Sequence, residues 1–114
     1  MKTYSNSFDA ITDLHNEGFA NDFQLFGNDL LWLREKRVIQ VGEFAILEYH
    51  KIDEAVGEFD KCIIVGIFAL QYNIKGILLR RFKTFSQDLP PVLIKKIKEL
   101  VIVHENKTKN EKNK

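Results

Sequence analysis

The sequence has few of the residues that staple or interrupt a fold. It contains one cysteine, Cys62, and two prolines, which are adjacent at positions 90 and 91. A single cysteine cannot form an internal disulfide, so a hydrophobic core must hold the 114-residue chain together. A chain of this length forms one domain and buries such a core without staples. Because Cys62 lies in an apolar run, we expect it to be a small core residue in a reducing cytoplasm.

Long hydrophobic runs are also missing. The longest apolar run, residues 62–70, is too short to span a bilayer. The N-terminus lacks the apolar stretch of a signal peptide. We therefore expect a soluble cytoplasmic protein that has no membrane partner.

The sequence contains no motif of a catalytic, phosphate or metal site. Its glycines stand singly, so neither a P-loop nor a dinucleotide fingerprint is present. Its three histidines, His15, His50 and His104, lack metal-ligand spacing and have no cysteine cluster to join them. These absences predict a protein that is not an enzyme and needs no cofactor or metal.

What the sequence does have is a strong separation of charge. Residues 1–60 hold 5 Lys and Arg against 12 Asp and Glu, whereas residues 61–114 hold 12 against 4. The two parts therefore carry −7 and +8, although the formal net charge of the whole chain is only +1. Such a split favours a protein partner or a homodimer.

A basic cluster lies in the second half, where Arg80, Arg81 and Lys83 interleave with Phe82 and Phe85. Cations that alternate with aromatic rings are typical of nucleic-acid surfaces. However, the isoelectric point of about 7.8 is below that of most basic domains that bind nucleic acid. We do not expect nucleic acid as the partner, and we keep the three cations as candidate binding residues.

Hydrophobic periodicity predicts an α+β fold in the order α-β-β-β-β-β-α. Short connections imply one two-layer domain over residues 1–103, with a mostly antiparallel sheet of four or five strands and both helices on one face. Residues 104–114 hold almost no apolar side chains and are expected to form a disordered tail. The helices are expected at residues 8–17 and from about residues 86–88 onward, and the strands at residues 22–25, 30–33, 44–52, 62–70 and 77–82.

Two elements carry detailed expectations. In the first helix, Ser5 or Ser7 is the expected N-cap, and Gly18 and Phe19 are placed to form a Schellman ending. Residues 62–70 are apolar on both faces, which is typical of a central strand, and Gly66 within them indicates a bulge or a close approach. The side chains expected to face the core from the first helix are Phe8, Ile11 and Leu14.

Two groups of polar residues are candidates for chemistry. Glu48 and His50 lie two residues apart in a predicted strand, so they share a face, and a histidine paired with a carboxylate can move protons. The alternative is a polar, solvent-facing stripe. Residues 53–60 contain a cluster of carboxylates that can bind a divalent cation, although its spacing is not that of an EF-hand; the alternative is a solvated surface loop.

Several stretches resemble a known family: MKTY at residues 1–4, FDAITDL at 8–14, EGF at 17–19, DFQL at 22–25 and LQYNIKGILL at 70–79. They are similar to small bacterial proteins of about a hundred residues that carry the name phosphoribosylpyrophosphate synthetase. The resemblance implies a phosphoribosyl-related ligand. A full synthetase is roughly three times longer and has consecutive aspartates followed by Thr-Gly-Gly-Thr. This sequence has no adjacent aspartates or glycines, so no catalytic residue is carried over.

We therefore expect a non-catalytic binding or interaction module that contacts another protein or a second copy through an exposed sheet face and its polarised charge. The alternative is an enzyme that binds a phosphoribosyl-related small molecule or a nucleotide with Glu48, His50 and Arg80. A second alternative is a nucleic-acid accessory protein that uses Arg80, Arg81 and Lys83.

Overall fold

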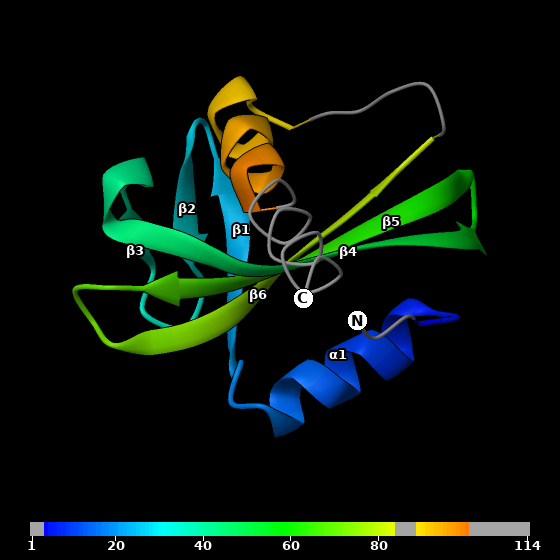
Figure 1. The fold of residues 1–114 in the computed structure, drawn as a ribbon, viewed down its shortest axis with the longest axis horizontal. Coiled ribbons are helices and arrows are strands. Elements are labelled where there is room, and N and C mark those ends of the chain that lie inside the picture. Colours follow the sequence, from blue (N-terminus) through cyan, green and yellow to red (C-terminus); the bar gives the residue numbers. More distant parts are fainter. Residues whose placement is uncertain (1–3, 84–88, 101–114) are drawn as a thin grey trace, which may run out of the picture.

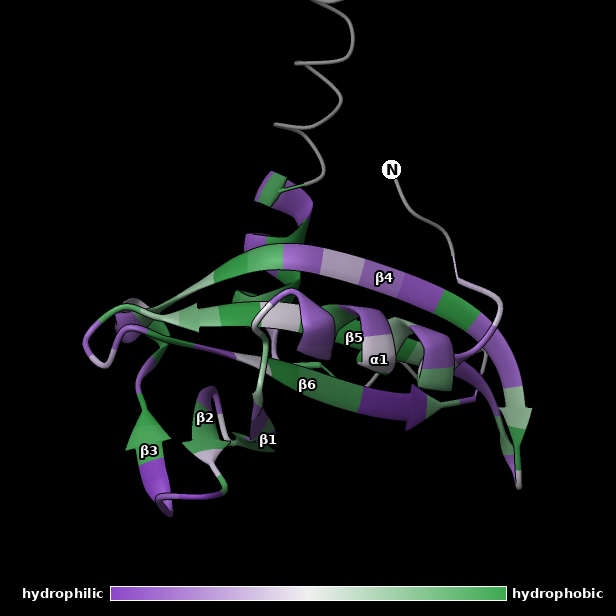
Figure 2. Ribbon diagram, turned by 90° about the horizontal axis from the view of Figure 1, so that it is seen from below, coloured by the Kyte–Doolittle hydropathy of each residue, from purple (hydrophilic) through white to green (hydrophobic). Residues whose placement is uncertain are grey.

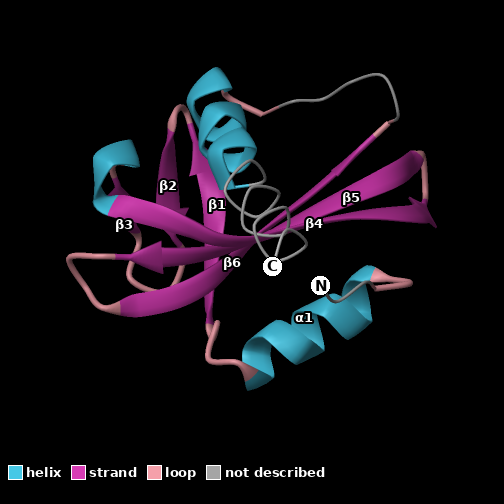
Figure 3. Cartoon of the chain, viewed as in Figure 1, coloured by secondary structure: helices cyan, strands magenta, loops and turns pink. Residues whose placement is uncertain are grey.

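The computed structural model describes residues 4–83 and 89–100 of the chain. It confirms an α+β fold that consists of one domain (Figure 3). The predicted tail and the expected start of the last helix lie outside the described residues. The elements are helix α1 (Ser7–Asn16), strands β1 (Asn21–Phe26), β2 (Asp29–Trp32) and β3 (Arg37–Ile39), a 3-10 turn η1 (Val41–Glu43), strands β4 (Phe44–Val56), β5 (Phe59–Ala69) and β6 (Ile74–Phe82), and a helical segment at residues 91–100.

The six strands form a single sheet in the order β3-β2-β1-β6-β5-β4 (Figure 1). Every neighbouring pair is antiparallel except β1 and β6, which are parallel. The sheet is therefore mostly antiparallel, as predicted, but it has six strands where the sequence predicts four or five. The additional strand is β3, which has only three residues and follows a charged segment, so no alternating pattern marks it.

The prediction that residues 53–60 form a surface loop is wrong. β4 continues to Val56, and β5 begins at Phe59, which pairs with Val56 across a two-residue turn. Gly57 stands in that turn with φ of 60°, a left-handed conformation that glycine adopts without strain. The carboxylates of this segment therefore lie on two paired strands and their turn instead of gathering in a loop.

The two helices lie on opposite faces of the sheet, which corrects the predicted two-layer arrangement. Residues of β5 alternate between the faces: Cys62 and Ile64 pack in one cluster with Leu14 of α1, whereas Ile63 and Val65 pack in another with Leu93 of the helical segment 91–100. We call the first face of the sheet the α1 face and the second the opposite face. Figure 1 shows α1 and the orange helix on either side of the strands.

Helix α1 begins and ends through local contacts. Its N-cap is Asn6 instead of the predicted serines, since the Asn6 side chain accepts a hydrogen bond from the Asp9 N–H at 2.8 Å. The predicted Schellman ending is confirmed: Gly18 has φ of 98°, and the N–H of Phe19 donates to the carbonyl of Leu14 at 3.0 Å. Phe8 does not face the core as predicted but is 75% exposed, because the buried side of α1 is formed by Ser7, Ala10 and Leu14.

Gly66 of β5 marks a close approach, as the sequence indicates. A Cβ at this position would lie 2.9 Å from the Phe19 ring and 3.3 Å from the Glu48 Cβ. On the paired strand β4 the register shifts between Ile46 and Glu48. This bulge changes the face of the side chains that follow, because one extra residue inverts the alternation of a strand. Ile46 therefore packs on the opposite face, whereas Glu48 lies beside Phe19 on the α1 face.

Candidate functional site

The Glu48–His50 pair predicted from the sequence is present, under the N-terminal end of the described chain. The His50 Nε2 lies 3.0 Å from the Glu48 Oε1. The pair is not the solvent-facing stripe of the alternative interpretation, because the His50 side chain is only 10% exposed. The Tyr4 ring packs edge-on against the imidazole at 5.0 Å, and the Tyr4 hydroxyl donates to Asp13 of α1. The pair thus joins β4 to the segment that leads into α1.

A second polar cluster fixes the first turn of α1. The Glu54 carboxylate of β4 accepts hydrogen bonds from the Ser7 N–H at 2.9 Å and the Ser7 hydroxyl at 2.7 Å. Arg81 of β6 donates to the Ser7 hydroxyl oxygen at 3.2 Å and lies 3.8 Å from Glu54. The bonds from Ser7, together with the Arg81 charge, hold the pKa of Glu54 below its usual value. We call Ser7, Glu54 and Arg81 the α1 clamp, since a carboxylate at a helix N-terminus stabilises that end.

The five candidate site residues do not form one site. Glu48, His50 and Arg81 lie on the α1 face, whereas Arg80 lies on the opposite face, where it lines a cavity with Ile63. Lys83, the next candidate along the chain, is 3.6 Å from the Glu58 carboxylate. Because neighbouring residues of a strand point to opposite faces, the sheet separates Arg80 from both Arg81 and His50. Within residues 4–83 and 89–100, these five side chains therefore form neither the predicted polar pocket nor a continuous basic surface.

The charge split of the sequence is partly neutralised inside the fold. Carboxylates of the acidic first half form ion pairs with cations of the basic second half, because the β4–β5 hairpin and β6 place them together. The pairs are Asp53 with Lys61 at 2.5 Å, Glu54 with Arg81 at 3.8 Å and Glu58 with Lys83 at 3.6 Å. The charge asymmetry therefore does not by itself require a partner.

An apolar surface that the sequence analysis did not single out lies on β1, β2 and β3. Their inward residues Leu30 and Ile39 belong to the core on the opposite face, so the intervening residues point to the α1 face. There Leu31 pairs with Val38, and Leu33 follows at the end of β2. Phe26 is 55% exposed, Leu33 42% and Val38 39%. We call Phe26, Leu31, Leu33 and Val38 the β1–β3 patch.

The β1–β3 patch is exposed because α1 covers only part of its face. A helix is about 10–12 Å across, whereas six strands spaced about 4.8 Å apart span about 24 Å. α1 packs against Cys62 and Ile64 of β5 and Ile77 of β6. Figure 2 shows α1 beside β5 and β6, with the largely hydrophobic strands β2 and β3 apart from it. The sequence signal for the patch was the apolar run of residues 30–33. A strand that is buried on one face needs apolar side chains only at every second position, so this run places apolar side chains on the other face too.

Other kinds of site receive no support from the described residues. Cys62 is fully buried, as predicted, and burial raises the pKa of its thiol to about 11, so it is not a reactive thiolate. In residues 4–83 and 89–100 no group of three or more His, Cys, Asp and Glu side chains is arranged to hold a metal ion. Within the same ranges no helix has the length and hydrophobicity needed to cross a membrane.

The chain was compared with known proteins in three ways. No family model, no curated protein and no solved structure matches it. What the protein does must therefore be argued from its own geometry.

Proposed function

We propose that this chain is a non-catalytic interaction module that binds a partner protein through the β1–β3 patch. The observation that carries the proposal is the exposure of Phe26, Leu33 and Val38 on a part of the sheet that no described helix covers. Apolar side chains that gather on one face of a sheet are typical of protein interfaces, whereas single exposed ones need no explanation. The sheet architecture supports this, since a sheet face is normally covered by another layer.

The face of the patch, and not the free edge of β3, is the proposed contact. β3 is the last strand of the described sheet, so its outer edge is open to strand addition. However, it has only three residues, and Arg37 and Val38 are exposed there. Short, charged edge strands are a common device against edge-to-edge pairing. A partner therefore gains more from the apolar side chains of the face than from the few backbone groups of the edge.

The contacts of the two polar clusters favour a structural role for them. Tyr4 packs on the imidazole of His50, and the Ser7 hydroxyl is bound to both Glu54 and Arg81. In the α1 clamp both the Ser7 hydroxyl and the Ser7 N–H donate to Glu54, so these bonds tie the first turn of α1 to β4, as a structural role requires.

Co-purification with matched variants tests the proposal. The tagged full-length chain is expressed in its source cell as wild type, as Val38→Asp and as Val56→Asp. Val38 is 39% and Val56 40% exposed, both lie in strands, and they stand at opposite edges of the sheet. We expect the wild type to recover a specific partner or a second copy. Val38→Asp should lower this recovery about tenfold, which corresponds to a loss of about 1.4 kcal/mol in binding free energy. Val56→Asp should leave the recovery unchanged. Equal recovery with both variants would contradict the proposal.

A further inference from the structure

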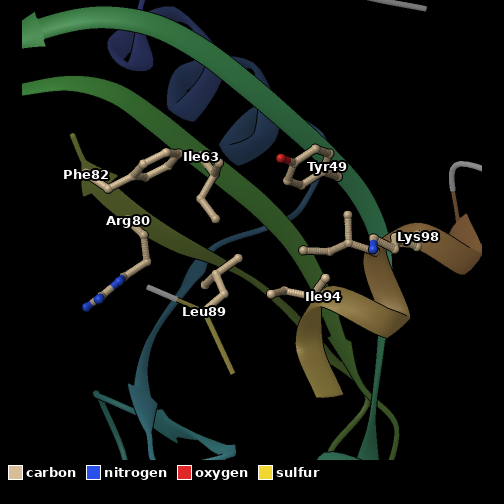
Figure 4. Close-up of a pocket in the computed structure, with 8 residues that line it drawn as sticks. Tyr49, Ile63, Arg80, Phe82, Leu89, Ile94 and Lys98 are labelled. Atoms are coloured by element: carbon tan, nitrogen blue, oxygen red, sulfur yellow. The ribbon is translucent and has the colours of Figure 1, made fainter. Parts of the chain in front are cut away.

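A cavity lies on the opposite face of the sheet, away from the β1–β3 patch. It has a volume of about 180 Å³, is partly open, and lies between β4, β5 and β6 on one side and the helical segment 91–100 on the other (Figure 4). Its apolar walls are formed by Ile63, Phe82, Leu89, Ile94 and Ile97. An apolar cavity of about 150 Å³ binds benzene. The cavity is therefore the right size for one aromatic ring or a short branched chain.

The polar side chains that line the cavity carry one hydroxyl and two positive charges. Tyr49 contributes a hydroxyl, and Arg80 and Lys98 contribute positive charge, whereas no carboxylate lines the cavity in the described part of the chain. Figure 4 shows the Tyr49 hydroxyl directed toward Ile63 and Phe82, and the Arg80 guanidinium directed away from Tyr49. Arg80 therefore lines the cavity with its stem and adds its charge from the margin.

The Tyr49 hydroxyl is a hydrogen-bond donor that the described protein does not use. Burial raises the pKa of Tyr49, so the hydroxyl stays protonated at neutral pH. No residue in 4–83 or 89–100 accepts a hydrogen bond from it. A half-buried donor in an apolar cavity is the group that fixes the orientation of a ligand. A ligand oxygen in the cavity could accept a hydrogen bond from the Tyr49 hydroxyl and so satisfy this donor.

We propose that the cavity binds a small apolar carboxylate, such as an aryl or branched-chain monocarboxylate. The apolar body packs against Ile63, Phe82 and Ile94, and the carboxylate accepts a hydrogen bond from Tyr49 in the positive field of Arg80 and Lys98. The cavity is smaller than the pockets of about 300–1,000 Å³ that take larger ligands, which favours a small carboxylate over a nucleotide. This site is independent of the β1–β3 patch, since the two lie on opposite faces of the sheet.

A titration with benzoate tests the site, with benzamide as the neutral ligand of the same shape. The isotope-labelled full-length chain is followed by amide and methyl NMR up to about 10 mM ligand, a range that detects millimolar affinities. We expect shifts that centre on Tyr49, Ile63 and Ile94. We expect benzoate to bind at least about fivefold tighter than benzamide, because both ligands can accept the hydrogen bond from Tyr49 but only the carboxylate carries a charge that strengthens it beside Arg80 and Lys98. Absence of shifts at these residues, or equal affinity for both ligands, overturns the proposal.

Variants separate the roles of the side chains. Lys98→Gln is expected to weaken benzoate about threefold and leave benzamide unchanged, whereas Lys95→Gln, an exposed lysine of the same helical segment outside the lining, changes neither. Tyr49→Phe is expected to weaken benzoate about fivefold, the effect of one lost hydrogen bond. Ile94→Phe is expected to fill the cavity and abolish binding, while the NMR spectrum of the variant remains that of a folded protein. If Lys95→Gln and Lys98→Gln act alike, or Ile94→Phe still binds, the site is not this cavity.

Discussion

At the scale of single residues, the Glu54 carboxylate makes the contacts that fix the start of α1. It accepts two hydrogen bonds from Ser7, which is only 5% exposed. No local pattern predicts this contact, because Ser7 and Glu54 are 47 residues apart in the sequence. The Schellman ending at Gly18 could be predicted, since it depends only on neighbouring residues. Local sequence predicts that Ser7 caps the helix, but its hydroxyl binds Glu54 of the sheet, a contact between residues that are distant in the sequence.

Replacement of Glu54 by glutamine is expected to destabilise the fold. Glu54→Gln keeps the shape but removes the charge that Ser7 and Arg81 face, so the free energy of unfolding should fall by about 1–2 kcal/mol at neutral pH. Urea denaturation followed by the fluorescence of Trp32, the one tryptophan, measures it. The control is Glu58→Gln, whose exposed pair with Lys83 should contribute less than about 0.5 kcal/mol. A loss as large for Glu58→Gln as for Glu54→Gln would argue against the α1 clamp.

The α1 clamp also makes stability depend on pH. The pKa of Glu54 is lower in the folded chain than in the unfolded chain, so the unfolded state binds more protons in the intervening range and stability rises with pH there. The contribution is complete above the ordinary pKa of glutamate and is lost as the pH falls through the lowered pKa. Glu54→Gln has no such group and should lose less stability on acidification. Parallel stability–pH curves for wild type and variant would contradict the clamp.

At the scale of elements, the parallel junction of β1 and β6 holds the two parts of the sheet together. Asn21 pairs with Gly76 across it, and the Asn21 side chain donates to the Lys75 carbonyl at 3.0 Å and accepts from the Trp32 indole at 3.1 Å. The sequence could not reveal this junction, because its strands are distant along the chain. The faces of the helices could have been inferred, since a strand that is apolar on both sides, as β5 is, needs a layer on each.

An alanine at Gly76 is expected to disrupt this junction. A Cβ there would lie 2.5 Å from the Asn21 carbonyl oxygen, and backbone cannot move aside as a flexible side chain can. Gly76→Ala should lower the free energy of unfolding by about 2–3 kcal/mol. Gly42→Ala is the control, because its Cβ would meet nothing within 4 Å. Denaturation curves of both variants give the comparison, and a Gly76→Ala chain as stable as Gly42→Ala would exclude the tight junction.

At the scale of the whole molecule, one six-stranded sheet carries a helix on each face, and the described helices leave one part of the α1 face uncovered. Most strands could be predicted, because they follow from local patterns. The candidate surfaces could not, because the β1–β3 patch and the Tyr49 cavity depend on which strands of a face each helix covers. The charge split predicted a partner, but pairs such as Glu54 with Arg81 show that part of it serves the fold itself.

The most direct test of the central claim is site-specific photocrosslinking in the source cell. A photoreactive phenylalanine analogue replaces Val38 of the β1–β3 patch in one chain and Val56, the matched valine at the other sheet edge, in another. We predict a discrete covalent adduct from position 38, with the mass of a partner protein or of a second copy, and none from position 56. No discrete adduct from position 38, or the same adduct from both positions, would contradict a binding function for the β1–β3 patch.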